Sequence, residues 1–335
     1  MSLAPPAKPD GLYTGPIEKN RSIWRRFVEQ REMTVAIVVV ALGAFLAIAS
    51  PNFLNPANLL ALILGLSFNA IVAVGMTVLM VSGGFDLSVG STLALAGAVA
   101  GYAMVSLHAP VPVAFLIGLS AGAVVGLGNG LLVAKVGVNP LIATLGMMSV
   151  VRGMVLLITS GFGIPNLPDS FNFIAQGKAF GVQLPVYIMI VCVVGGDILL
   201  RRSRYFRQSY FVGGNMKSAR LSGIRVGRVQ IVNYIISGTM AALAGLLLAA
   251  RFGTASVSAG QGVELQVISA VVIGGASLAG GEGTVLGALL GVTLMALISN
   301  GLNLLGINVY WQTIVIGSVL VIAVAADALS RRSQA

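Results

Sequence analysis

Long apolar stretches recur along the chain from Thr34 to Ala326, with short polar segments between them. Most hold roughly 18 to 25 residues, the length that an α-helix needs to cross the apolar layer of a bilayer. A soluble domain would show shorter apolar runs interrupted by polar faces. The pattern therefore predicts an all-α, polytopic transmembrane helical bundle. We expect about ten transmembrane helices, over residues 33–50, 57–81, 88–107, 111–134, 140–160, 185–200, 229–251, 263–279, 284–301 and 309–328.

Composition agrees with a membrane protein. Hydrophobic residues make up 57% of the chain and charged residues 9%, whereas a soluble domain carries about 25% charged residues. Of the 30 charges, 21 lie in three short segments, at residues 1–32, 201–228 and 327–332. The net charge is +10, and the basic residues border the apolar spans instead of forming a stripe on a folded surface. We therefore expect contact with membrane lipid and no nucleic-acid partner.

The single cysteine, Cys192, and the single histidine, His108, exclude a disulfide framework and a Cys/His metal cluster. We expect no metal site. The chain also lacks the G-x-x-x-x-G-K-[ST], G-x-G-x-x-G and H-E-x-x-H patterns. We therefore expect no catalytic residues and no cofactor bound by this chain.

The distribution of Lys and Arg predicts the orientation. With a cytoplasmic N-terminus and ten crossings, 17 of the 20 basic residues lie on the inner side, Lys178 and Arg251 lie outside, and Arg152 falls within a span. This strong positive-inside bias places both termini in the cytoplasm. An even number of crossings is favoured, and eight, with two spans merged or re-entrant, is an alternative.

We divide the chain into a cytoplasmic N-terminal tail at 1–32, a transmembrane permease domain at 33–328 and a cytoplasmic tail at 329–335. We expect no secretory signal peptide at the N-terminus. Apolar residues at helical spacing among its arginines predict an interfacial helix or a solvated tail. Segment 161–184 is expected outside, as a cap or docking surface. Segment 201–228 is expected inside, where its eight basic residues bind lipid headgroups or a partner.

A polar turn stands between the second and third spans. Asp86 and Ser88 can accept hydrogen bonds from the free N–H groups of the helix that follows, and the glycines around them, including Gly90, permit a sharp reversal. A helix cap is one interpretation. A gate or hinge beside a pathway is the other, because an acid near bilayer depth is costly and commonly marks function.

Other polar residues lie within the spans. Arg152 would be costly against lipid and must face protein, water or an acid. Asn69, Asn129 and Thr144 could offer hydrogen bonds to a hydroxylated solute or could bond neighbouring helices. Glycines at every fourth position predict smooth, closely packed helix faces; these are Gly118, Gly122, Gly126 and Gly130 in the fourth span and Gly283, Gly287 and Gly291 in the ninth.

Four stretches, taken together and in order, resemble the ribose-type permease subunits of bacterial ABC sugar importers, within the branched-chain amino acid and ribose permease superfamily. These stretches are GMTVLMVSGGFDLSVGS at 75–91, NPLIATLG at 139–146, GGN and ARLSGI at 213–215 and 219–224, and GGASLAGGEGT at 274–284. Phe85 departs from the family pattern, which usually has a smaller aliphatic residue before the Asp.

The resemblance implies an inner-membrane translocation subunit for a monosaccharide or related small polyol. It implies a second permease subunit, identical or different, a cytoplasmic ABC ATPase that uses ATP and Mg, and a periplasmic sugar-binding protein. It also implies that the ATPase engages a cytoplasmic coupling loop, made of Gly214, Asn215, Ala219, Arg220, Leu221, Ser222, Gly223 and Ile224. The gate or pathway residues are then Asp86, Ser88, Gly90, Asn69, Asn129, Thr144 and Arg152.

Three alternatives stay open. A branched-chain amino-acid permease is a related possibility, but the Asp-Leu-Ser-Val-Gly sequence at 86–90 argues against it. A secondary transporter driven by an ion gradient would need an acid deep in a span, whereas Asp86, Asp197, Glu264 and Glu282 lie near span ends in this interpretation. A membrane scaffold without transport activity would carry no solute.

Overall fold

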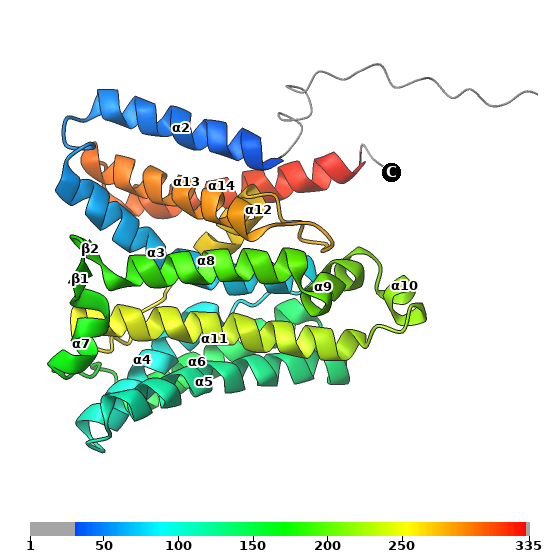
Figure 1. Cartoon of the computed structure of the whole chain (residues 1–335), viewed down its shortest axis with the longest axis horizontal. Coiled ribbons are helices and arrows are strands. Elements are labelled where there is room, and N and C mark those ends of the chain that lie inside the picture. Colours follow the sequence, from blue (N-terminus) through cyan, green and yellow to red (C-terminus); the bar gives the residue numbers. More distant parts are fainter. Residues whose placement is uncertain (1–30, 333–335) are drawn as a thin grey trace, which may run out of the picture.

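The computed structural model describes residues 31–332, and helices form almost all of its regular structure (Figure 1). A helix lies at each of the ten predicted spans. These helices are α2 (Arg31–Ala49), α3 (Pro56–Val81), α4 (Val89–Val105), α5 (Val111–Leu131), continued by the π-helical turn η1 (Leu132–Val136), α6 (Pro140–Thr159), α8 (Leu184–Arg202), α11 (Val226–Phe252), α12 (Val263–Ile273), α13 (Val285–Leu304) and α14 (Val309–Arg332). The interfacial helix considered for the N-terminal tail falls almost wholly outside the described residues.

Seven of the described helices are long and apolar enough to cross a membrane, namely α2, α3, α5 with η1, α6, α8, α11 and α13. Helices α4 and α12 are apolar but shorter, with 17 and 11 residues. The chain is therefore a polytopic membrane protein. The prediction of one helix over 263–279 is wrong at its end, because α12 stops at Ile273 and a glycine-rich loop follows, with left-handed Gly275 and Gly280.

Local sequence sets the ends of several helices. Asn55 and Asn139 each cap a helix, accepting a hydrogen bond from the main-chain N–H two residues on, both at 2.9 Å. A proline follows each of these caps at the first helical position, where its fixed φ fits and its missing N–H costs nothing. Helix α11 ends at Gly253, whose φ of +64° suits a residue without a side chain.

The helices pack as a series of neighbours from α2 through α13, α3 and α11 to α5 (Figure 1). Helix α11 lies against α3, α4 and α5, and residues Ala70 to Val81 of α3 are all buried. Small residues let the backbones approach closely, which is the usual means of packing helices inside a membrane. The bundle is thus built around α3 and α11.

Short elements gather at the two ends of the bundle (Figure 1). Helices α9 (Arg204–Gly214) and α10 (Met216–Leu221) lie at one end, together with the start of α2 and the end of α14. At the opposite end lie α7 (Asp169–Gln176) and an antiparallel hairpin of β1 (Lys178–Ala179) and β2 (Val182–Gln183). The polar segments predicted for opposite sides of the membrane therefore stand at opposite ends.

Candidate coupling and pathway sites

Asp86, Ser88 and Asn129 form a buried polar cluster between the turn after α3 and the end of α5. The Asp86 carboxylate oxygen Oδ1 accepts hydrogen bonds from the Ser88 N–H at 2.8 Å, the Ser88 hydroxyl at 2.6 Å and the Asn129 amide at 3.2 Å. The Asn129 amide also donates to Ser88 Oγ at 2.9 Å. The second oxygen of Asp86 and the Asn129 carbonyl oxygen are buried and have no hydrogen-bond partner among the described residues.

The helix-cap interpretation is wrong for Ser88. This residue precedes α4, but its side chain accepts no hydrogen bond from the first turn of the helix. The Asp86 carboxylate instead accepts from the N–H two residues on, which closes the turn before the helix begins. The cluster therefore holds the α3–α4 turn against α5.

Gly90 lies where two chain segments meet. A β-carbon at this position would overlap the carbonyl oxygen of Gly260 and a carboxylate oxygen of Glu264. Gly260 itself has a left-handed φ of +72°. The segment between α11 and α12 therefore touches the start of α4, and neither glycine has room for a side chain.

Arg152 fixes the same segment from α6. Its guanidinium donates hydrogen bonds to the main-chain oxygens of Val257 at 2.7 Å and Ala259 at 3.1 Å. The charge is half-buried and meets protein, as the cost of facing lipid requires. Arg152 therefore positions the segment that precedes α12.

The other two predicted pathway residues lie elsewhere. Thr144 is buried, and its hydroxyl donates to the Pro140 carbonyl of its own helix at 2.9 Å. Asn69 is half-buried on α3 and donates to the Gln266 side chain on α12 at 3.2 Å. The structure thus brings Asp86, Ser88 and Asn129 together in one hydrogen-bonded cluster. Thr144 and Asn69 form their hydrogen bonds with other residues, outside this cluster.

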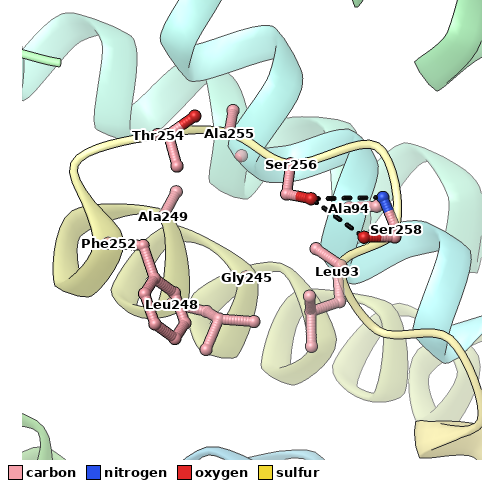
Figure 2. A pocket seen from close by; sticks show the side chains of 12 residues that line it. Leu93, Ala94, Gly245, Leu248, Ala249, Phe252, Thr254, Ala255, Ser256 and Ser258 are labelled. Carbon is pink, nitrogen blue, oxygen red and sulfur yellow. Dashed lines mark hydrogen bonds between the residues drawn. The ribbon is translucent and has the colours of Figure 1, made fainter. Parts of the chain in front are cut away.

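An apolar cavity that the sequence did not indicate lies beside the segment between α11 and α12. Its volume is about 370 Å³, and α4, α11 and residues 254–259 line it. Figure 2 shows Leu93, Leu248 and Phe252 on its wall, with Ser256 hydrogen-bonded to Ser258 on the segment above. That segment falls between the predicted spans at 229–251 and 263–279, so its apolar and polar pattern gave no sign of a cavity.

The basic segment after α8 folds into the helical hairpin α9–α10. Asn215 separates the two helices and accepts a hydrogen bond from the Ser218 N–H at 3.0 Å. Gly223 ends the hairpin with a φ of +82°. Ala219 is buried in a small apolar cluster with Ile224 at its edge, whereas Leu221 is 90% exposed at the tip. Gly214, Arg220 and Ser222 are also exposed.

Helix α9 is attached to three other parts of the bundle. Gly213 packs against the end of α3 and against the loop before α13. A β-carbon at Gly213 would overlap the Val81 oxygen of α3 and the Gly281 nitrogen of that loop. The buried Asn233 amide of α11 donates to Ser209 at 3.0 Å. The Tyr210 hydroxyl donates to the Gly283 oxygen at 2.8 Å, and burial raises the pKa of Tyr210 above its ordinary value.

The glycine stripe of α5 faces α11. β-carbons at Gly118, Gly122, Gly126 and Gly130 would all come closer than 3 Å to atoms of α11. On α13, Gly287 and Gly291 approach the main chain at Gly274 and Ala270 in the same way. The assignment of Gly283 to this helix stripe is wrong, because α13 begins at Val285.

Gly283 lies in the preceding loop with a φ of +136°. Its four-residue spacing from Gly287 therefore does not place it on the glycine face of α13. In the loop, a β-carbon at this position would crowd Ala276.

The sequence profile of one family, described as the permease component of the branched-chain amino acid transport system, matches residues 58–324. The chain belongs to this permease family. It is 41% identical over 304 residues to the ribose import permease protein of Escherichia coli K12, covering 90% of this chain and 94% of that protein. The family supplies permease components, so this permease is a transport subunit and not itself an ATPase.

Further relatives of the permease carry sugar names. The ribose import permease protein of Bacillus subtilis 168 is 40% identical, with 89% of this chain and 96% of that protein covered. The galactose/methyl galactoside import permease protein of Haemophilus influenzae is 33% identical, with 93% and 97% covered. No solved structure matches the permease.

Proposed function

We propose that this permease is the translocation subunit of an ATP-driven importer for a monosaccharide or a related small polyol. Relatives named for ribose and galactose import cover nearly the whole chain and support a sugar substrate. In the proposed complex, a second permease subunit, identical or different, completes the pathway. A cytoplasmic ABC ATPase uses ATP and Mg, and a periplasmic binding protein delivers the sugar.

We propose ten crossings of the bacterial inner membrane, with both termini in the cytoplasm. The tails at 1–32 and 329–335 then flank a permease domain at 33–328. Helix α12 is too short to cross alone. The segment at 253–262 and α12 together complete that crossing, since Arg152 and Gly90 hold the segment inside the bundle. The basic α9–α10 hairpin lies on the inner side, in agreement with the positive-inside rule.

One observation carries the coupling proposal: α9 touches the inner ends of α3 and of the loop before α13. Gly213 packs against Val81 and Gly280, so a displacement of α9 cannot leave those two positions unmoved. Closure of the ATPase dimer against the α9–α10 hairpin would therefore move both inner ends. That movement would convert the subunit between outward-open and inward-open states.

The coupling loop then comprises Gly214, Asn215 and residues 219–224, with Leu221 as its exposed apolar contact. Asp86 and Ser88 form the inner hinge with Asn129, and Gly90 lets the segment before α12 lie against it. Arg152 positions that segment. Thr144 remains a proposed pathway residue through its place on α6, although its hydroxyl bonds its own helix.

The test is reconstitution of the permease with its ATPase and binding protein in liposomes. ATP-dependent uptake of a labelled monosaccharide is the expected result. Leu221→Asp should abolish co-purification of the ATPase, because a charge replaces the exposed apolar contact. Leu221→Met is the matched control and should retain both uptake and the ATPase.

Each alternative gives a different outcome. Uptake that follows an imposed ion gradient without ATP would favour a secondary transporter. Uptake of leucine or valine but not of sugars would favour the branched-chain amino-acid type. Absence of flux under every energising condition would favour a scaffold.

A further inference from the structure

A second cavity, of about 370 Å³, lies between α3, α12, α13 and α14. Uncharged polar side chains from all four helices line it, in contrast to the apolar cavity beside α4. These are Asn69, Gln266, Ser299, Asn300, Asn303 and Gln312. The cavity shares only Asn69 with the residues singled out from the sequence.

The amides of this cavity are joined in pairs between helices. Asn58 and Asn300 exchange hydrogen bonds at 2.8 and 3.3 Å. Gln312 donates to Asn303 at 2.6 Å, and Asn69 donates to Gln266. From Asn58 to Asn69 the amides follow α3 for about 16 Å, at 1.5 Å per residue.

Contact with lipid would be energetically costly for these amides. Ala61 and Gly65 form the α3 wall of the cavity and are exposed, so the groove is open at the surface of this subunit. A row of amides open to hydrocarbon would be costly, and such faces normally meet protein or water. The groove therefore faces a partner subunit or an aqueous pathway.

The chemistry of the lining fits a neutral, hydroxylated solute. Each amide offers both donors and acceptors, and none of the lining residues carries a charge. Small and apolar residues between the amides, Ala61, Gly65 and Ala296, leave room for the carbon face of a sugar ring. A cavity of this volume falls within the range of about 300–1,000 Å³ that is typical of small-molecule sites.

The cavity has a closed inner end. Beyond Asn69, every α3 residue to Val81 is buried. In the proposed topology, the start of α3, the end of α13 and the start of α14 all lie at the outer face. The groove thus opens outward, where a binding protein would release its solute.

We propose that this amide-lined groove is the sugar-contacting wall of the pathway in the outer half of the subunit. As the solute passes, the amide–amide hydrogen bonds break and the amides bind sugar hydroxyls instead. This inference rests on the proposed function. It assigns a binding role to Gln266, Asn300, Asn303 and Gln312, with Asn58 as the hydrogen-bond partner of Asn300.

Thiol accessibility tests whether the groove is aqueous. In a Cys192→Ala background, Ser299→Cys places a thiol in the groove, and Leu116→Cys places one on α5, where the native leucine is 61% exposed. Both sites lie five residues from the outer ends of their helices. A membrane-impermeant methanethiosulfonate reagent should modify Ser299→Cys about tenfold faster, since thiols in apolar surroundings do not ionise.

Addition of sugar-loaded binding protein should slow modification of Ser299→Cys. Equal rates at the two sites, or no protection by the sugar, would overturn the proposal. The accessibility measurement needs no transport, so its result does not depend on the ATP-driven mechanism.

Transport by a paired variant tests the hydrogen bonds themselves. Asn58→Leu with Asn300→Leu keeps the number and branching of the side-chain heavy atoms but removes the amides, and should lower sugar uptake about tenfold. ATP hydrolysis stimulated by the binding protein should persist. The control is Thr293→Val on α13, because the Thr293 hydroxyl bonds only the Leu289 oxygen of its own helix; it should transport normally.

The outcomes separate the two proposals. If the native complex shows no ATP-driven sugar uptake, the proposed function fails. If the native complex transports and the double leucine variant does too, only the groove assignment fails. A parallel loss of thermal stability and of ATP hydrolysis would also overturn the assignment, because the amides would then serve helix packing alone.

Discussion

The main-chain N–H of Gly281 donates a hydrogen bond to the carbonyl oxygen of Val81 at 2.9 Å. Val81 ends α3, and Gly281 lies in the loop that leads to α13. Gly213 of α9 packs against both residues with no space for a β-carbon. These contacts thus join the end of α3 and the loop before α13 to the α9–α10 hairpin.

Adjacent glycines allow a direct test of this contact. Gly213→Ala should lower stability by about 1–3 kcal/mol, because its methyl group would overlap main-chain atoms that cannot move aside. Gly214→Ala is the control, since no atom lies within 4 Å of its β-carbon position. Thermal denaturation of the purified complex in detergent compares the two. Equal melting temperatures would contradict the close contact.

The α5–α11 interface gives a second pair. Gly122→Ala places a methyl group against Ala242 and the Gly238 oxygen, and should cost about 1–3 kcal/mol through overpacking. Gly146→Ala on α6 meets nothing within 4 Å and should cost nothing, because alanine favours helix. Melting temperatures of the two variants measure the difference. A neutral Gly122→Ala would show that the helices separate more easily than this packing implies.

Arg152 provides a third prediction. Arg152→Met removes two charge-assisted hydrogen bonds to the segment at 257–259, each worth roughly 1.5–3 kcal/mol. We expect a lower melting temperature of the purified complex, together with reduced sugar uptake. Arg152→Lys keeps the charge and one donor group and should recover part of both. A native melting temperature in Arg152→Met would rule out the positioning role.

Much of the fold could be predicted from local pattern. The apolar run that begins at Pro140 gave the length of α6 within one residue. Two predictions were wrong at glycines, one made from the spacing of Gly283 and the other from the apolar run over 263–279. Gly283 lies outside its helix, and the span at 263–279 ends six residues early. Glycine permits both a packed helix and a left-handed turn, and neighbouring contacts decide between them.

The structure brings some of the predicted pathway residues together. Asp86 and Ser88 are close in sequence, so their association follows from one local turn, and Asn129 joins them from α5. The groove amides were missed apart from Asn69. A signal existed, since Asn and Gln recur in otherwise apolar spans, but the residue types alone do not show that four helices turn them toward one cavity.

By itself, the sequence determined that the chain is a multi-pass membrane protein, because apolar length governs insertion through each segment's own contact with the bilayer. Tertiary structure decided where polar side chains meet. Asn69 and Gln266 are 197 residues apart yet share a hydrogen bond. Local periodicity encodes which residues avoid lipid, whereas the partner of each depends on how whole helices pack.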